Sequence, residues 1–111
     1  MCSESELAEI LKEVRIEAET VFQDSLDAVI LYGSYAQKTA HAESDIDVMI
    51  RVNLSKAELD RYMIPISVFA SRLGLKHDVV ISIHLQDSET FDAWKDILPF
   101  YQNVVRYGVS V

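Results

Sequence analysis

The sequence is poor in cysteine, glycine and proline. Its 111 residues include one Cys, three Gly and two Pro, whereas half are hydrophobic and a quarter are charged. This composition excludes a fibrous repeat and a disordered chain, so we expect a globular protein. The single cysteine, Cys2, has no partner for an internal disulfide. A chain of this length fits one small domain, which we expect to cover residues 1–111.

The sequence also lacks long apolar runs and an excess of basic residues. No apolar stretch approaches the roughly 20 residues that cross a bilayer, and the first residues are acidic where a signal peptide would be basic. We therefore expect a cytoplasmic protein with no membrane partner. A net charge of −8 disfavours direct binding to nucleic acid, because such affinity comes largely from Lys and Arg at phosphates.

The spacing of hydrophobic residues predicts alternating helices and strands. A capping box at Ser3 begins a first helix over about residues 4–23, and a second capping box at Ser55 begins a helix that runs to Gly74. Pro65 predicts a kink or two abutting helices. The tail predicts a helix from about Ile97 that Gly108 ends. Short runs of strand-forming residues predict three strands, at residues 27–33, 45–52 and 78–85.

The stretch with the clearest chemistry runs from Gly33-Ser34, through ten residues, to Asp45-Ile46-Asp47. Glycine lets a phosphate approach the backbone, and a short helix beginning after Ser34 offers free N–H groups. Asp45 and Asp47 lie on one face of a strand, so their carboxylates can converge on metal ions. Since all these ligands are oxygen donors, the pattern favours Mg²⁺ or Mn²⁺ over Zn²⁺.

Asp78 is the candidate third carboxylate, because it begins the next predicted strand. If the two strands are neighbours in the sheet, Asp78 lies beside Asp45 and Asp47. It can then ligate a metal ion or take the proton from an attacking hydroxyl, and the sequence leaves both roles open. An Asp-x-Asp pair alone is more often a cap or surface decoration. The combination with Gly-Ser and a further strand-borne aspartate is what favours a site.

At these residues the sequence resembles the DNA polymerase β-like nucleotidyltransferase superfamily, and its size resembles the minimal nucleotidyltransferase (MNT) family. The superfamily pattern is Gly-Ser, ten residues, Asp-x-Asp and a third carboxylate on a later strand. The resemblance implies an α+β fold in which helices pack against a small mixed sheet. It also implies that Gly33 and Ser34 hold ATP, that Asp45 and Asp47 hold two Mg²⁺ ions, and that Asp78 completes a catalytic and metal-binding triad.

The sequence departs from the family pattern after the Gly-Ser pair. Gln37 and Lys38 stand where many relatives have Arg-Gly, so one cation expected near the phosphates is missing. Lys38 is the candidate that replaces this cation. The departure leaves open the affinity for the nucleotide and the choice between ATP and other nucleotides.

The resemblance implies transfer of AMP from ATP to a hydroxyl and leaves three functions open. MNT proteins are often encoded beside a helical HEPN-type ribonuclease toxin and neutralise it by adenylylating a tyrosine, which is the function we favour. A small-molecule enzyme similar to aminoglycoside nucleotidyltransferases is disfavoured, because those enzymes build their acceptor pocket from a further domain. An antitoxin that only covers the toxin's active site is disfavoured as well, because it has no need of the carboxylates.

Overall fold

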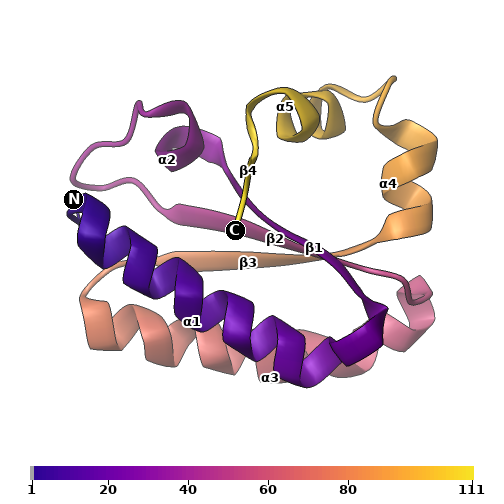
Figure 1. Ribbon diagram of the computed structural model, residues 1–111, viewed down its shortest axis with the longest axis horizontal. Coiled ribbons are helices and arrows are strands. Elements are labelled where there is room, and N and C mark those ends of the chain that lie inside the picture. Colours follow the sequence, from indigo (N-terminus) through magenta and orange to yellow (C-terminus); the bar gives the residue numbers. More distant parts are fainter. Residues whose placement is uncertain (1) are drawn as a thin grey trace.

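The protein is a mixed four-stranded sheet with helices on both faces (Figure 1). The computed structural model describes residues 2–111. The strands are β1 (Leu26–Tyr32), β2 (Ile46–Val52), β3 (Ile81–Asp87) and β4 (Val109–Ser110). They lie in the order β3-β2-β1-β4, in which β2 and β3 are parallel and β1 is antiparallel to both of its neighbours. The expected α+β class with a small mixed sheet is confirmed.

The two long helices cover one face of the sheet and three short helices lie on the other (Figure 1). The long helices are α1 (Glu4–Phe22), which a 3-10 turn at Gln23–Ser25 joins to β1, and α3 (Lys56–His77). The short helices are α2 (Gly33–Gln37), α4 (Ser88–Trp94) and α5 (Pro99–Tyr107). No helix in the described part of the chain is long and apolar enough to cross a membrane.

The main core lies between the sheet and the helices α1 and α3. Side chains alternate along a strand, and the residues that β2 sends into this core are Ile46, Val48, Ile50 and Val52. The intervening residues of β2 face the short helices, where Met49 packs with Phe91 and Val104 in a second, smaller cluster. Asp47 shares that second face with Met49. The alternation therefore separates the apolar core from the face that carries the candidate site.

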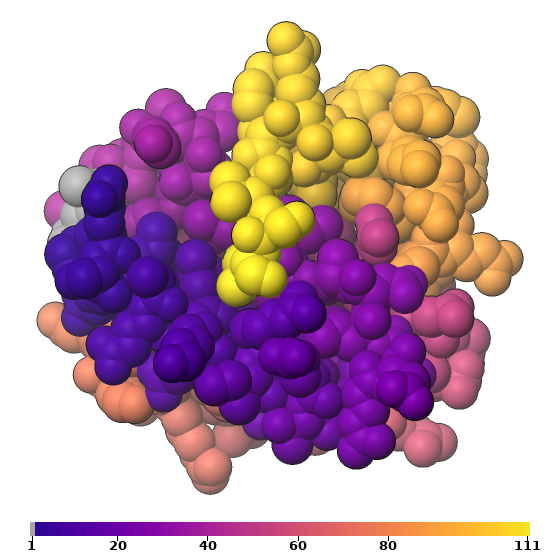
Figure 2. All heavy atoms as spheres, viewed as in Figure 1, coloured from indigo at the N-terminus to yellow at the C-terminus, as the bar shows by residue number. Residues whose placement is uncertain are grey.

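The C-terminal segment closes the sheet beside β1. The backbone N–H of Val111 donates to the carbonyl of Val29, and Arg15 of α1 donates from its guanidinium to the carbonyl of Val111 at 3.3 Å. Figure 2 shows this segment, in yellow, lying across the surface above the N-terminal helix. The last residues thus join the strand that leads into the candidate site.

The structure corrects several expectations about α3 and β3. Of the two alternatives at Pro65, two abutting helices are not found, because a single helix runs through this residue. The helix also passes Gly74, its expected end, and continues to His77. Pro65 faces solvent, where water can satisfy the carbonyl that it leaves unbonded. Gly74 allows a close approach instead of ending the helix, because a Cβ there would lie 2.6 Å from the carbonyl oxygen of Val79. As a result β3 begins at Ile81, three residues later than predicted.

The tail also differs from the single helix that was expected. Asp87 accepts a hydrogen bond from the N–H of Thr90 and begins the separate helix α4. The helix α5 starts at Pro99, a position that suits proline because the first helical N–H has no partner to lose. Gly108 follows its end as expected.

Candidate active site

The candidate site lies where β1 ends and β2 begins. These two ends meet because the strands are antiparallel, and Tyr32 pairs directly with Asp47. The next residue, Gly33, has φ +74°, and a Cβ built on it would lie 2.5 Å from Asp47 Oδ2. Glycine is therefore needed here both for its backbone conformation and for the space it leaves. The close approach holds a carboxylate against the backbone at the start of α2.

Asp45 and Asp47 act on each other electrostatically. Asp45 is exposed and Asp47 is half-buried. Burial raises the pKa of the Asp47 carboxyl above its usual range, and the negative charge of Asp45 raises it further. The pKa of Tyr32 is also raised, first by burial and then by the charge of Asp47. The site therefore already disfavours negative charge, and a bound cation would remove this repulsion.

Ser34 and Lys38 lie at opposite ends of the short helix α2. Ser34 is in its first turn, beside Gly33, and its carbonyl accepts a hydrogen bond from the N–H of Thr39. Lys38 is the left-handed residue that ends the helix, with φ 59°. It lines a cavity of about 260 Å³ between α2 and the start of α1, together with Cys2 and Leu7. Contact of Lys38 with phosphates stays a prediction.

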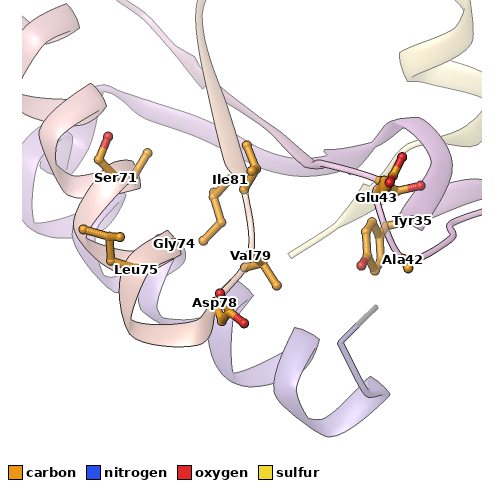
Figure 3. Close-up of a pocket in the computed structure, with 12 residues that line it drawn as sticks. Tyr35, Ala42, Glu43, Ser71, Gly74, Leu75, Asp78, Val79 and Ile81 are labelled. Carbon is orange, nitrogen blue, oxygen red and sulfur yellow. The ribbon is translucent and has the colours of Figure 1, made fainter.

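Asp78 is not on a strand. It follows the last residue of α3 in the left-handed conformation, with φ 55° and ψ 46°. It lines a cavity of about 540 Å³ with Glu43 and Tyr35, and Figure 3 shows its carboxyl group at this cavity. Within residues 2–111, no three His, Cys, Asp or Glu side chains gather in a way that could hold a metal ion. The expected convergence of Asp45, Asp47 and Asp78 is therefore not found.

The neighbour of Asp47 on β3 is Ser82. The two residues are paired across the parallel strands, and His84 is paired with Met49 in the same register. Alternation then places Ser82, His84 and Gln86 on the face of the sheet that carries Asp47. Sequence reasoning missed these residues. The alternating pattern of β3 was visible, but the register between β2 and β3 was not.

An aromatic cluster from α5 borders this face. The ring of Phe100 lies 5.7 Å from that of Tyr32 and 5.8 Å from that of His84, both in edge-to-face geometry. Tyr101 lies 5.3 Å from Phe100, and its hydroxyl donates to Gln86 Oε1 at 3.2 Å. The end of β1, the middle of β3 and the C-terminal helix thus meet beside the aspartate pair.

Comparison with known proteins identifies the family to which the chain belongs. The model of the nucleotidyltransferase domain family matches residues 7–101. "Putative protein adenylyltransferase MJ0141" of Methanocaldococcus jannaschii is 38% identical over 108 residues, which cover 96% of this chain and 99% of the relative. "Putative protein adenylyltransferase MJ0604" of the same organism is 31% identical over 98 residues, 88% of this chain and 90% of the relative.

Solved structures show the same fold. Two crystal structures of mutants of the toxin-antitoxin MntA-HpeT match with a TM-score of 0.51 each, at 24% and 22% identity. The matches cover 90% and 89% of this chain, and 70% of the other chain in both cases. The family model and the relative similar along its whole length show that the chain belongs to the nucleotidyltransferase domain family, as an enzyme of the nucleotidyltransferase type.

Proposed function

We propose that this enzyme transfers AMP from ATP to a hydroxyl group of a partner protein, and that the acceptor is a tyrosine of a HEPN-type toxin encoded beside it. The observation that carries the proposal is the packing of Asp47 against Gly33, with the charge of Asp45 close enough to raise the pKa of Asp47. Relatives named as protein adenylyltransferases support the protein acceptor, and the toxin-antitoxin structures of the same fold support a toxin.

The two carboxylates suit Mg²⁺. This ion is commonly bound through one or two carboxylates, with waters and substrate phosphates filling the remaining positions. Asp45 and Asp47 would hold the metal ions, and Mn²⁺ would fit the same oxygen donors. When bound, the metal neutralises charge on the triphosphate and makes the α-phosphorus more open to attack. The repulsion between the carboxylates in the metal-free protein is consistent with such a site.

The chain's own residues bind and orient the nucleotide. The backbone at Gly33 carries no side chain, so phosphate oxygens can come close to it, and the Ser34 hydroxyl can donate a hydrogen bond to them. The acceptor hydroxyl must lie in line with the bond from the α-phosphorus to the departing oxygen. Asp45 is exposed, which leaves the site open for a hydroxyl on the surface of another protein.

Intact-mass spectrometry tests the proposal. The protein is incubated with ATP, Mg²⁺ and the product of its neighbouring gene, and we expect about 329 Da to be added to the neighbour for each AMP transferred. The double variant Asp45→Asn, Asp47→Asn should add nothing. A matched control is Asp24→Asn, Asp60→Asn, which removes two charges at exposed positions on other elements and should transfer normally.

Two results would contradict the proposal. An unchanged neighbour mass with the wild-type enzyme would exclude this acceptor. If the Asp45, Asp47 double variant neutralised a toxic neighbour as well as the wild type does, the protein would act by covering the toxin and not by catalysis.

A further inference from the structure

The strand beside Asp47 carries a hydroxyl and a histidine where a third carboxylate was expected. Ser82 is the direct neighbour of Asp47, and His84 is the next residue of β3 on the same face. Strands lie roughly 4.8 Å apart, and alternate residues are roughly 6.6 Å apart along a strand, so the Cα atoms of Asp47 and His84 are separated by about 8 Å. His84 is exposed. Its imidazole is therefore accessible beside the candidate site.

The hydrogen bonds of Gln86 fix which nitrogen of His84 carries the proton. Gln86 is only 4% exposed, and its amide nitrogen donates to the carbonyl oxygen and to Oδ1 of Asp87, at 3.2 and 3.3 Å. Its amide oxygen therefore faces His84 Nε2 at 2.9 Å and the Tyr101 hydroxyl at 3.2 Å. An amide oxygen can only accept, so both partners donate to it. In the neutral imidazole the proton is on Nε2, and Nδ1 keeps a free lone pair.

The surroundings also hold the ring of His84 in place. The Phe100 ring contacts it edge to face and contacts Tyr32 in the same way. The titratable and charged groups around this face include Asp47 and Arg51 of β2, Asp45 just before that strand, Tyr32 of β1 and Tyr101 of α5. Arg51 lies over the ring of Phe91, 4.9 Å from its centre, and Tyr101 is engaged with Gln86. The contacts with Phe100 and Gln86 therefore fix the orientation of the His84 ring.

We propose that His84 is a catalytic residue that accepts the proton of the attacking hydroxyl on Nδ1, a role that rests on the proposed function. The hydroxyl oxygen forms a bond to the α-phosphorus. The bond from this phosphorus to the oxygen bridging to the β-phosphate breaks, and pyrophosphate leaves with that electron pair. The hydroxyl proton moves to Nδ1, and the resulting imidazolium releases it to water because the ring is exposed. Gln86 is a positioning residue that keeps the proton on Nε2.

NMR of the metal-free wild-type protein tests the tautomer independently of activity. The chain has three histidines, and comparison with His84→Gln assigns the ring nitrogens of His84 in ¹⁵N-labelled protein. We expect the neutral ring to carry its proton on Nε2. A neutral ring with its proton on Nδ1 would overturn the proposal, because that nitrogen would then have no free lone pair.

Kinetics of His84→Gln test the proton transfer. Glutamine keeps a similar size but cannot take up a proton at neutral pH, so kcat should fall by about 100-fold or more, as is typical for the loss of a general base. The affinity for ATP with Mg²⁺ should change by less than about twofold, because His84 is not assigned to the phosphates or the metal. The wild-type rate should rise with pH over the range in which imidazoles titrate, and the variant should lose this rise.

The control is His41→Gln, which replaces an exposed histidine in the loop before β2 and should transfer at the wild-type rate. Equal kcat values for His84→Gln and the wild type, or an unchanged pH profile in the variant, would overturn the role of His84 and leave the proposed function standing. A wild-type enzyme that transfers no AMP to its neighbour at any pH would end the proposed function, and this role with it.

Discussion

At the residue scale, the site depends on a carboxylate held where it is electrostatically unfavourable. Asp47 packs against Gly33, is half-buried and lies close to the negative charge of Asp45. Burial and the charge of Asp45 both disfavour the ionised Asp47 carboxylate in the metal-free protein, and a bound cation would offset both effects. Gly33 provides the space, because any larger residue would displace Asp47 Oδ2. The same contact links the strand end that would bind phosphate to the strand that would bind metal.

The raised pKa of Asp47 predicts how stability depends on pH. Because burial, and then Asp45, raise this pKa in the folded state, the native protein binds a proton more readily than the unfolded chain does. The free energy of unfolding should therefore decrease as pH rises from the unfolded-state pKa through the raised native pKa, and stay lower above it. Asp47→Asn removes this loss, so the metal-free variant should melt at the same temperature as the wild type or higher at neutral pH.

Thermal melts with chelator from about pH 3 to pH 7, on either side of the usual carboxyl range, measure this effect. The advantage of Asp47→Asn should shrink toward the acid end, where the wild-type carboxyl is also neutral. Asp60→Asn, at an exposed position of α3, should not show this trend. A wild type that gains stability over Asp47→Asn as pH rises would contradict the assigned electrostatics.

At the scale of elements, the junction between α3 and β3 decides where Asp78 lies. The helix passes Gly74 and ends at His77, and Asp78 then reverses the chain in the left-handed conformation. The backbone N–H of Val79 donates to the carbonyl of Gly74 at 3.0 Å, which completes the cap. Asp78 is therefore fixed by the end of the helix and lies three residues before β3.

Replacements of Asp78 separate a role in this turn from a role in catalysis. Asparagine adopts the left-handed conformation at least as readily as aspartate, so Asp78→Asn should keep wild-type stability. Alanine should cost about 1 kcal/mol, because its Cβ is strained at positive φ without a compensating side-chain hydrogen bond. Chemical denaturation measures both effects. We also expect Asp78→Asn to bind ATP with Mg²⁺ as the wild type does, and a loss of binding would place Asp78 in the metal site after all.

The elements differ in how well the sequence predicted them, for identifiable reasons. The helix α1 and the strands β1 and β2 were placed within one or two residues, because local periodicity and capping determine them. The sequence pattern assigned Gly33 and Asp47 to one site, but their direct contact depends on the pairing of β1 with β2 and was not predicted. The start of β3 was misplaced because Val79 and Val80 have strand-forming side chains but belong to the turn after α3. The pairing of Ser82 with Asp47 depends on a register between distant segments, which no local pattern encodes.

At the scale of the whole molecule, the sheet brings together residues from most of the chain length. The strand β1 leads into Gly33, β2 carries Asp47, and the parallel strand β3 adds Ser82 and His84. The helix α5 returns to this side of the sheet (Figure 1), where Phe100 packs against Tyr32. A ligand bound at this point contacts elements that are separated along the chain. Its binding should therefore stabilise the fold as a unit and not one element alone.

Ligand binding of this kind predicts a metal-dependent shift in melting temperature. A ligand that binds only the native state stabilises it by about 2.7 kcal/mol at one hundred times its Kd, and for a domain of about 100 residues each kcal/mol raises Tm by roughly 4 °C or more. ATP with Mg²⁺ at such concentrations should therefore raise the Tm by on the order of 10 °C.

ATP with excess chelator should have little effect on the Tm, because the triphosphate then meets the unneutralised charges of Asp45 and Asp47. The Asp45→Asn, Asp47→Asn variant should lose most of the shift with Mg²⁺, whereas the Asp24→Asn, Asp60→Asn control should keep it. An equal shift with and without the metal would mean that the nucleotide binds away from the aspartate pair, since no site built around two carboxylates attracts a polyanion unless a cation lies between them.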